Sequence, residues 1–115
     1  MQRSALPGKQ KSKPFKGVPL QQVMKQPLFS LGQVVATPGA SAALKKARQQ
    51  GGEFLTRHVN REWGDLHDED RKENEYGLER GFRLLSAYRT NAGDRLWIIT
   101  EADRSLTTLL LPEEY

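Results

Sequence analysis

Residues 82–111 read FRLLSAYRTNAGDRLWIITEADRSLTTLLL, and this stretch carries the strongest structural signal in the chain. Residues 82–89 and 95–101 are rich in aromatic, leucine and β-branched side chains, which favour strands. The five residues between them include Gly93 and have the length of a hairpin loop. Residues 105–111 form a third apolar run after a short polar turn. The stretch therefore predicts a three-stranded antiparallel meander.

Two details place these strands within a sheet. The run Leu96–Ile99 is continuously apolar, as is typical of a central strand that is covered on both faces. Pro112 ends the last strand, because proline has no N–H for a β-ladder. If the strand Leu106–Leu111 lies at an edge, its apolar surface needs a cover, and pairing into a homodimer would supply one.

The chain before the meander predicts a strand and then a helix. Residues 33–37 are a short β-branched run that stops at Pro38. Thr37 is well placed as a helix N-cap, with Pro38 at the first helical position, where its missing N–H costs nothing. Residues 40–48 are mostly good helix formers, and the glycine pair at 51–52 is expected to end the helix.

Further helical structure is expected before the meander begins. Residues 53–58 predict one or two helical turns, closed by Trp63-Gly64. Residues 65–80 predict a second long helix, because acids begin it and a basic residue and a glycine end it. The element order is then β-α-α-β-β-β. We expect an α+β fold in which an antiparallel sheet carries its helices on one face.

Charge divides the chain near Phe29. Residues 1–29 hold six Lys and Arg and no acid, whereas residues 30–115 hold the other 12 Lys and Arg and all 14 Asp and Glu. The net charge of +4 is thus +6 in the first segment and −2 in the second. Four prolines interrupt residues 1–29 and prevent a long helix there. We expect a basic, flexible leader at 1–29 and a single compact domain at 30–115.

Composition excludes several classes of protein. The chain has no cysteine, which excludes disulfides and thiolate metal sites and favours a reducing cytoplasm. No apolar run approaches the roughly 18 residues of a membrane span, and the N-terminus lacks the apolar block of a secretory signal. We therefore expect a cytoplasmic protein that makes no contact with a membrane.

The residues around Trp63 have two interpretations. His58 and His67 flank it, but their spacing fits no known metal-ligand pattern, so neither a metal nor another cofactor is predicted. Trp63 could fill the core at a corner between helices. Alternatively, it could stack on a base or bind a side chain of a partner.

Charged residues suggest two further candidate sites. Glu101, Asp103 and Arg104 lie at one end of the sheet, where two carboxylates and a guanidinium could handle a phosphate or a proton. The alternative is a hydrogen-bonded turn with an internal Asp–Arg pair.

Basic residues form the second candidate site. Lysines of the leader could bind phosphate through counterion release, or they could simply keep a terminus soluble. Basic residues after position 44 could form a stripe on a helix. The predicted partner-binding residues are Lys9, Lys11, Lys13, Lys16, Lys45, Lys46, Arg48 and Trp63.

Several segments resemble a family of small bacterial proteins often found on plasmids, phages and integrative elements. The similar segments are residues 29–40, 53–58, 63–66, 96–105 and 111–115. Some members of that family carry the label of a type I restriction endonuclease subunit. The resemblance implies a protein of a mobile element and, as one possible role, interference with host restriction or another defence system.

The predicted element order is also similar to that of RelE-type ribonuclease toxins. Those toxins use scattered basic and aromatic residues rather than a contiguous motif. This resemblance implies an alternative set of catalytic residues, which comprises Arg83, Arg89, Asp103, Arg104 and Tyr115. The net charge of −2 in residues 30–115 argues against it, because an enzyme that grips ribosomal RNA needs a positive face.

The sequence thus favours a non-enzymatic binding module of a mobile element. It contains no assembled nucleophile, metal or phosphate-binding motif. The expected partner is a host or element-encoded protein, or a nucleic acid held by the basic leader. The alternative is a RelE-like ribonuclease toxin.

Overall fold

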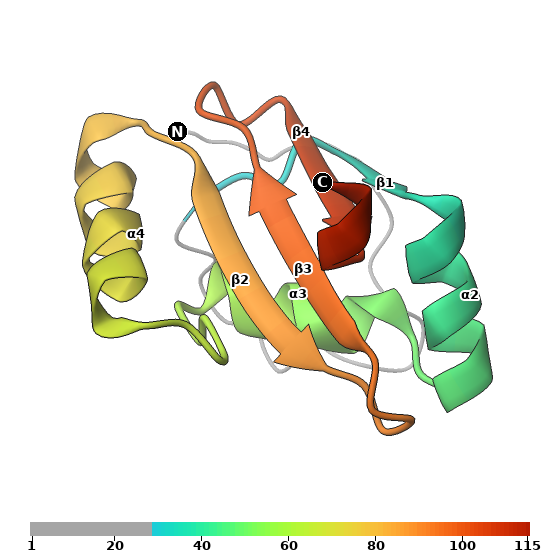
Figure 1. Ribbon diagram of the computed structural model, residues 1–115. Helices are drawn as coiled ribbons and strands as arrows, with labels where there is room; N and C mark the ends of the chain where they lie inside the picture. Colours follow the sequence, from blue (N-terminus) through green and yellow to red (C-terminus); the bar gives the residue numbers. More distant parts are fainter. Residues whose placement is uncertain (1–28) are drawn as a thin grey trace, which may run out of the picture.

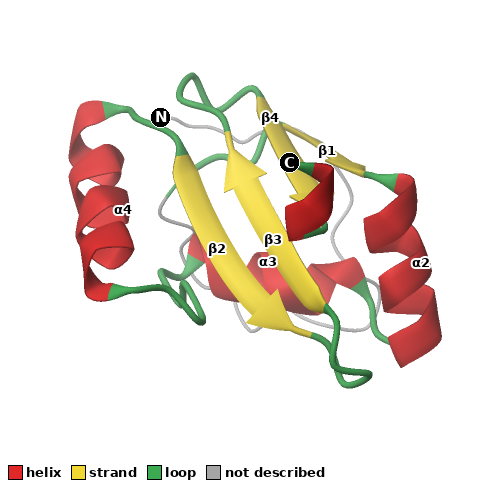
Figure 2. Cartoon of the chain, in the orientation of Figure 1, coloured by secondary structure: helices red, strands yellow, loops and turns green. Residues whose placement is uncertain are grey.

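The computed structural model describes residues 29–115 (Figures 1 and 2). The elements are β1 (Gln33–Ala36), α2 (Pro38–Ala47), α3 (Gly51–Val59), α4 (Asp68–Arg80), β2 (Leu84–Arg89), β3 (Arg95–Thr100), β4 (Leu106–Leu110) and the 3-10 helix η1 (Pro112–Glu114). The expected leader lies outside the described residues, apart from Phe29. The leader lysines Lys9, Lys11, Lys13 and Lys16 therefore have no structural description here.

The four strands form one mixed sheet in the order β1-β4-β3-β2. The predicted meander is confirmed, because β2 pairs with β3 and β3 with β4, both antiparallel. The expectation of a wholly antiparallel sheet is wrong for β1, which runs parallel to β4 from the pair Gln33↔Leu106 onward. Parallel neighbours need a long crossover, and the three helices with the hairpin supply it.

This topology places β4 inside the sheet instead of at its edge. The exposed edge that motivated a homodimer through Leu106–Leu111 is therefore absent, because β1 covers it. The strand β3 is also internal, as the apolar run Leu96–Ile99 predicted.

The outer edge of β2 is covered by the segment that precedes α4. Asp65 N–H donates to Ala87 O (2.7 Å), and Ala87 N–H donates to Trp63 O (2.9 Å). Gly64 has a φ of +82°, and a Cβ atom there would lie 2.0 Å from Ala87 O. Two residues before Ala87, the Asn74 side chain of α4 bonds the Leu85 backbone, accepting from its N–H (3.0 Å) and donating to its C=O (2.7 Å). These contacts satisfy an edge that would otherwise invite pairing with another chain.

Three helices precede β2, where the sequence predicted two. Residues 53–58 belong to a full helix, α3, which begins at Gly51. The glycine pair therefore starts α3 and does not end α2. The end of α2 is Arg48, whose φ of +56° is left-handed and whose N–H bonds the carbonyls of Leu44 and Lys45. Gly51 suits a helix start here because a Cβ atom would come within 3.3 Å of the Leu109 side chain on β4.

The predicted helix caps of α2 and α4 are largely confirmed. Thr37 caps α2 by accepting from Ala40 N–H, and Pro38 is the first helical residue. Gly81 ends α4 with a φ of +77°. The helix begins at Asp68, three residues later than expected, with three acids in its first turn that complement the helix dipole.

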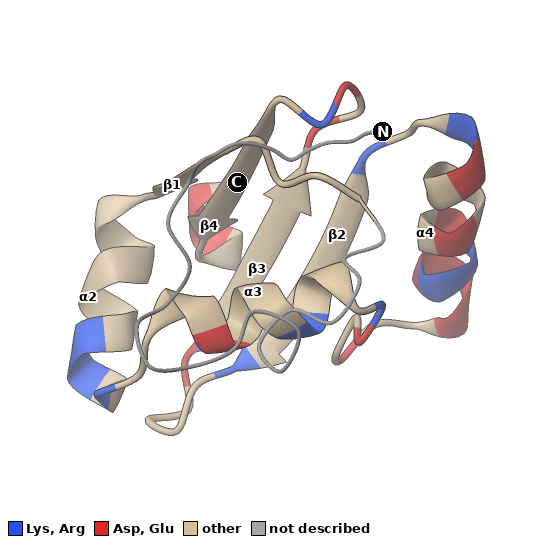
Figure 3. Cartoon of the chain, turned by 180° about the vertical axis from the view of Figure 1, so that it is seen from behind, with Lys and Arg blue, Asp and Glu red and all other residues tan. Residues whose placement is uncertain are grey.

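The helices do not share one face of the sheet. In Figures 1 and 3, α3 crosses one face, whereas α2 lies beside the β1 edge and α4 beside the β2 edge. The core lies under α3, where Phe54 packs with Tyr88, Leu96, Ile98 and Leu109. Of the elements within residues 29–115, only η1 lies on the opposite face, over part of β3 (Figure 1). None of the helices within residues 29–115 is long and apolar enough to cross a membrane.

Candidate functional site

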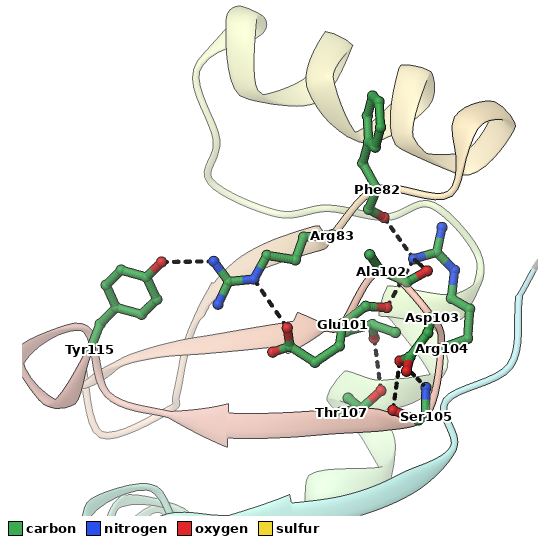
Figure 4. Close-up of polar contacts among 10 residues, drawn as sticks. Phe82, Arg83, Glu101, Ala102, Asp103, Arg104, Ser105, Thr107 and Tyr115 are labelled. Carbon is green, nitrogen blue, oxygen red and sulfur yellow. Dashed lines mark hydrogen bonds and ion pairs between the residues drawn. The ribbon is translucent and has the colours of Figure 1, made fainter.

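The polar end of the sheet brings together three of the residues that sequence reasoning singled out (Figure 4). Arg83 Nη1 donates to Tyr115 Oη at 2.9 Å, and Arg83 Nε lies 3.4 Å from Glu101 Oε1. The Arg83 guanidinium also lies over the Tyr115 ring, 5.6 Å from its centroid. The hydrogen bond to Tyr115, aided by Glu101, raises the pKa of Arg83 above its ordinary value. Arg83 is therefore a fixed cation whose charge Glu101 matches.

Arg104 lies nearby but acts on the backbone. Its guanidinium donates to the carbonyls of Gly77 (3.0 Å), Phe82 (2.6 Å) and Glu101 (3.1 Å). Its own backbone is left-handed, with a φ of +62°. Burial lowers the pKa of Arg104. Arg104 thus ties the end of α4 to the turn between β3 and β4 through both of its terminal nitrogens.

Asp103 and Arg89 do not join this group. Asp103 accepts from the N–H and the hydroxyl of Ser105, and these bonds lower the pKa of its carboxyl. The turn is therefore hydrogen-bonded as one interpretation predicted, but Asp103 bonds Ser105 and not Arg104. Arg89 lies at the other end of β2 and donates to Gly93 O in the hairpin loop (3.0 Å). Of the five residues implied by the toxin resemblance, only Arg83 and Tyr115 are joined by a side-chain hydrogen bond.

Trp63 is a core residue and not a partner-binding one. Its side chain is 2% exposed, and its indole N–H donates to Glu75 Oε2 at 2.9 Å. Arg61 also pairs with Glu75, which fixes the carboxylate that Trp63 needs. A ring buried in this way has no free face for a base or for a side chain of a partner.

His58 forms a buried polar network that sequence reasoning missed. Its Nδ1 bonds Ser86 Oγ (2.5 Å) and its Nε2 bonds Thr100 Oγ1 (2.9 Å). Thr100 Oγ1 bonds Thr107 Oγ1 at 2.8 Å, and Thr107 donates to the Leu31 carbonyl. The hydroxyls occupy inward positions of β2, β3 and β4, so polar residues within predicted apolar strands were the available signal.

Burial determines the chemistry of His58. The side chain is fully buried and is bordered by the Phe29 ring (5.2 Å between centroids) and the Trp63 ring (5.6 Å). Desolvation, with a smaller contribution from the charge of Arg104, lowers the pKa of His58 to about 3. His58 is thus a neutral core residue without access to substrate. His67 is exposed at the start of α4, and no His/Asp/Glu group within residues 29–115 could hold a metal.

The expected basic stripe lies at the end of α2. Lys45, Lys46 and Arg48 are exposed there (Figure 3). Lys46 Nζ pairs with Asp94 Oδ2 of the hairpin loop at 2.8 Å. The three residues are neighbours in space, but one of their charges is already matched.

A second feature absent from the sequence analysis is a groove on the sheet face opposite α3. It has a volume of about 290 Å³ and runs between α4 and the C-terminal residue, Tyr115. The residues that matter for its chemistry are Asp70, Glu73, Leu85, Trp97, Ile99 and Tyr115. Trp97 and Tyr115 meet edge to face at 5.7 Å between centroids, and Tyr115 is 68% exposed. Sequence reasoning treated Trp97 only as a core strand residue, because it did not foresee that the helices leave this face open.

Comparisons of the chain with protein-family models, with curated proteins and with solved structures gave no match. The assignment of a function therefore depends on the side chains of residues 29–115 and on the distribution of charge along the chain.

Proposed function

We propose that this protein is a non-enzymatic binding module and that it engages a protein partner through the groove beside α4. The observation that carries the proposal is the aromatic pair Trp97–Tyr115 on the sheet face opposite α3, which within residues 29–115 is covered only by η1, with Arg83 stacked against the pair. Trp, Tyr and Arg are the residue types that most often dominate the binding energy of protein interfaces.

The candidate catalytic groups support this proposal by what they already bind. Arg104 is engaged by backbone carbonyls, Asp103 by Ser105, and the His58–Ser86 pair is enclosed in the core. A nucleophile or base must reach the reacting atoms of a substrate. Arg104 and the His58–Ser86 pair could reach a substrate only by breaking contacts that hold the domain together, and Asp103 only by giving up its bonds to Ser105.

The proposed biological role of the module is based on the sequence alone. The resemblance to plasmid, phage and integrative-element proteins makes it a component of a mobile element, and interference with host restriction is the corresponding role. Plating a restricted phage on a restricting host, with and without the protein, tests this role. Equal plating efficiencies would contradict a role in host restriction but would not test binding of a protein partner in the groove.

Affinity capture from a bacterial lysate tests the binding proposal. We expect the full chain to retain a specific protein after nuclease treatment, and Tyr115→Ala and Trp97→Ala to lose that same protein. The matched variant Lys45→Ala/Lys46→Ala, on a distant surface, should retain it. Loss of all captured protein on nuclease treatment, together with dependence on Lys45 and Lys46, would instead favour a nucleic-acid partner.

The second candidate is the RelE-like ribonuclease, and the contact among Arg83, Tyr115 and Glu101 is the observation that favours it. In such an enzyme, the guanidinium and the tyrosine hydroxyl would both donate hydrogen bonds to a phosphate of the RNA. Expression in a bacterial host separates the candidates. A toxin arrests growth, and Arg83→Ala abolishes the arrest. A binding module without nuclease activity leaves RNA intact, and Arg83→Ala makes no difference to growth.

A further inference from the structure

We infer that the partner segment that enters the groove is a basic segment of another protein, in which Lys or Arg side chains alternate with apolar ones. This inference rests on the proposed function and specifies the chemistry of its partner. It follows from the charges on one wall of the groove, from the composition of its floor, and from its size.

The α4 wall of the groove is acidic, and Lys72 of the same helix lines the adjoining hollow with both carboxylates but pairs with neither. Asp70 and Glu73 are both exposed on it, and within residues 29–115 neither forms an ion pair. The cation in the groove, Arg83, already has its charge matched by Glu101. The groove therefore presents excess negative charge. An occupant that covers these carboxylates without a positive group would bury them unpaired, which is costly.

The floor of the groove is apolar and aromatic. Leu85, Trp97 and Ile99 lie on adjacent strands and point away from α3, and Ile99 is 6% exposed. The long side chains of Lys and Arg pack their methylene groups on such surfaces and keep the charge near the rim. A cation above Trp97 or Tyr115 would also gain a cation–π interaction. Floor and wall thus favour the same kind of side chain.

Size favours a segment of a macromolecule over a free small molecule. The volume of about 290 Å³ is at the lower limit of the ~300–1,000 Å³ typical of small-molecule pockets. A second, more open hollow lies on the outer side of α4 against Glu69, Lys72 and Tyr76, and it shares Asp70 and Glu73 with the groove. The two carboxylates therefore form a ridge between two depressions, which an extended segment could cross. A nucleic acid is disfavoured because its phosphates would meet this ridge.

The helix itself supplies a matched control. Residues 70, 73 and 74 lie within about 100° of one another around α4, whereas Glu79 lies roughly 180° from Asp70, given 3.6 residues per turn. Glu79 is exposed, like Glu73. Glu73→Lys and Glu79→Lys therefore make the same change in net charge on the same helix, but only the first changes the groove.

The test is selection of random twelve-residue peptides, displayed on phage, against the immobilised full chain. We expect enriched peptides with several Lys or Arg and with apolar residues between them. Synthetic copies should bind Glu73→Lys about tenfold or more weakly and Glu79→Lys within about twofold of the unchanged chain. Tyr115→Ala, which alters an exposed side chain and leaves the core intact, should also weaken binding.

The outcomes separate this inference from the proposed function. Enriched peptides that are neutral or acidic, but that still depend on Tyr115 and Trp97, would overturn the inference and leave the binding module in place. No enrichment, or peptides insensitive to both aromatic variants, would overturn both. A single-stranded RNA oligonucleotide that binds with the same dependence on Tyr115 would also overturn the inference.

Discussion

Arg104 shows how one side chain can replace several helix- and turn-capping interactions. It bonds the carbonyls of Gly77 in the last turn of α4, Phe82 in the loop before β2, and Glu101 directly after β3. We expect Arg104→Ala to lower the free energy of unfolding by about 3 kcal/mol, because charge-assisted bonds to these carbonyls are lost together. Urea unfolding followed by circular dichroism measures this change.

The control for Arg104 is Arg95, an exposed arginine at the start of β3. Arg95→Ala removes the same charge and should change the free energy of unfolding by less than about 0.5 kcal/mol. Equal effects of the two substitutions would contradict the structural role of Arg104. If Arg104→Ala changes bacterial growth but folds as stably as the unchanged protein, the effect reflects a chemical role of Arg104. If the variant loses its folded state, the loss of structure explains the effect on growth.

His58 gives a prediction about pH. Its pKa is about 3 in the folded protein and about 6.5 in an unfolded chain, so between these values only the unfolded chain takes up the proton. The contribution of His58 to stability is complete above pH 6.5 and is lost as the pH falls toward 3, by up to about 1.4 kcal/mol per pH unit. The free energy of unfolding, measured in urea from pH 7 to pH 4, should therefore decrease.

Two histidine variants isolate this effect from the titration of carboxylates. His58→Gln removes the titrating group and should flatten the pH dependence, even if it also lowers stability at pH 7. His67→Gln, at an exposed position before α4, should leave the slope unchanged. Identical slopes in both variants would show that His58 is not the source of the pH dependence.

At the scale of elements, β2 is held by β3 on one side and by the Asn74 side chain of α4 on its outer edge. Asn74 is 3% exposed and pairs with the Leu85 backbone as a neighbouring strand would. We expect Asn74→Ala to cost about 2 kcal/mol, because both backbone groups lose their partner. The Leu85 amide should also exchange with solvent roughly tenfold faster or more, measured by hydrogen exchange in NMR spectra.

Asn91 provides the comparison for Asn74. It lies exposed in the β2–β3 loop, where its backbone N–H, and not its side chain, bonds Gln49. Asn91→Ala should leave both the stability and the exchange at Leu85 unchanged. Unchanged exchange in Asn74→Ala would mean that the β2 edge is held by Ala87 and its partners alone.

The elements also show which signals in the sequence are reliable. Local chemistry predicted the hairpin, the Thr37 cap and the Gly81 stop, because each depends on a few adjacent residues. It placed the end of α2 wrongly, because a glycine pair is the usual stop and nothing local marks Arg48 as left-handed. The left-handed conformation of Arg48 depends on tertiary packing, because the chain must turn there to bring the start of α3, at Gly51, close to β4.

For the whole molecule, the strand order of the sheet and its open face could not be predicted from the sequence. The pairing of β1 with β4 joins segments about 70 residues apart, and the pattern of apolar residues in neither strand indicates which strand it pairs with. The same long-range arrangement encloses Trp63, which has charged neighbours in the sequence, and leaves Trp97, which lies in an apolar run, lining a groove. The resemblance to ribonuclease toxins named Arg83 and Tyr115 as candidate residues, but nothing in the sequence predicted that the two contact each other.

The division of charge along the chain leads to a prediction about nucleic acids. Residues 30–115 carry a net −2, and Lys46 is already paired with Asp94, so most of the attraction for phosphate must come from residues 1–29. We expect weak, non-specific binding of duplex DNA at low salt, measured by fluorescence anisotropy. Replacing the four leader lysines at positions 9, 11, 13 and 16 by Gln should reduce the slope of log K against log salt by roughly 3 to 4. Lys45→Gln/Lys46→Gln should leave it nearly unchanged. A slope that follows Lys45 and Lys46 instead would place the phosphate contacts on α2 and make the folded domain the nucleic-acid-binding part.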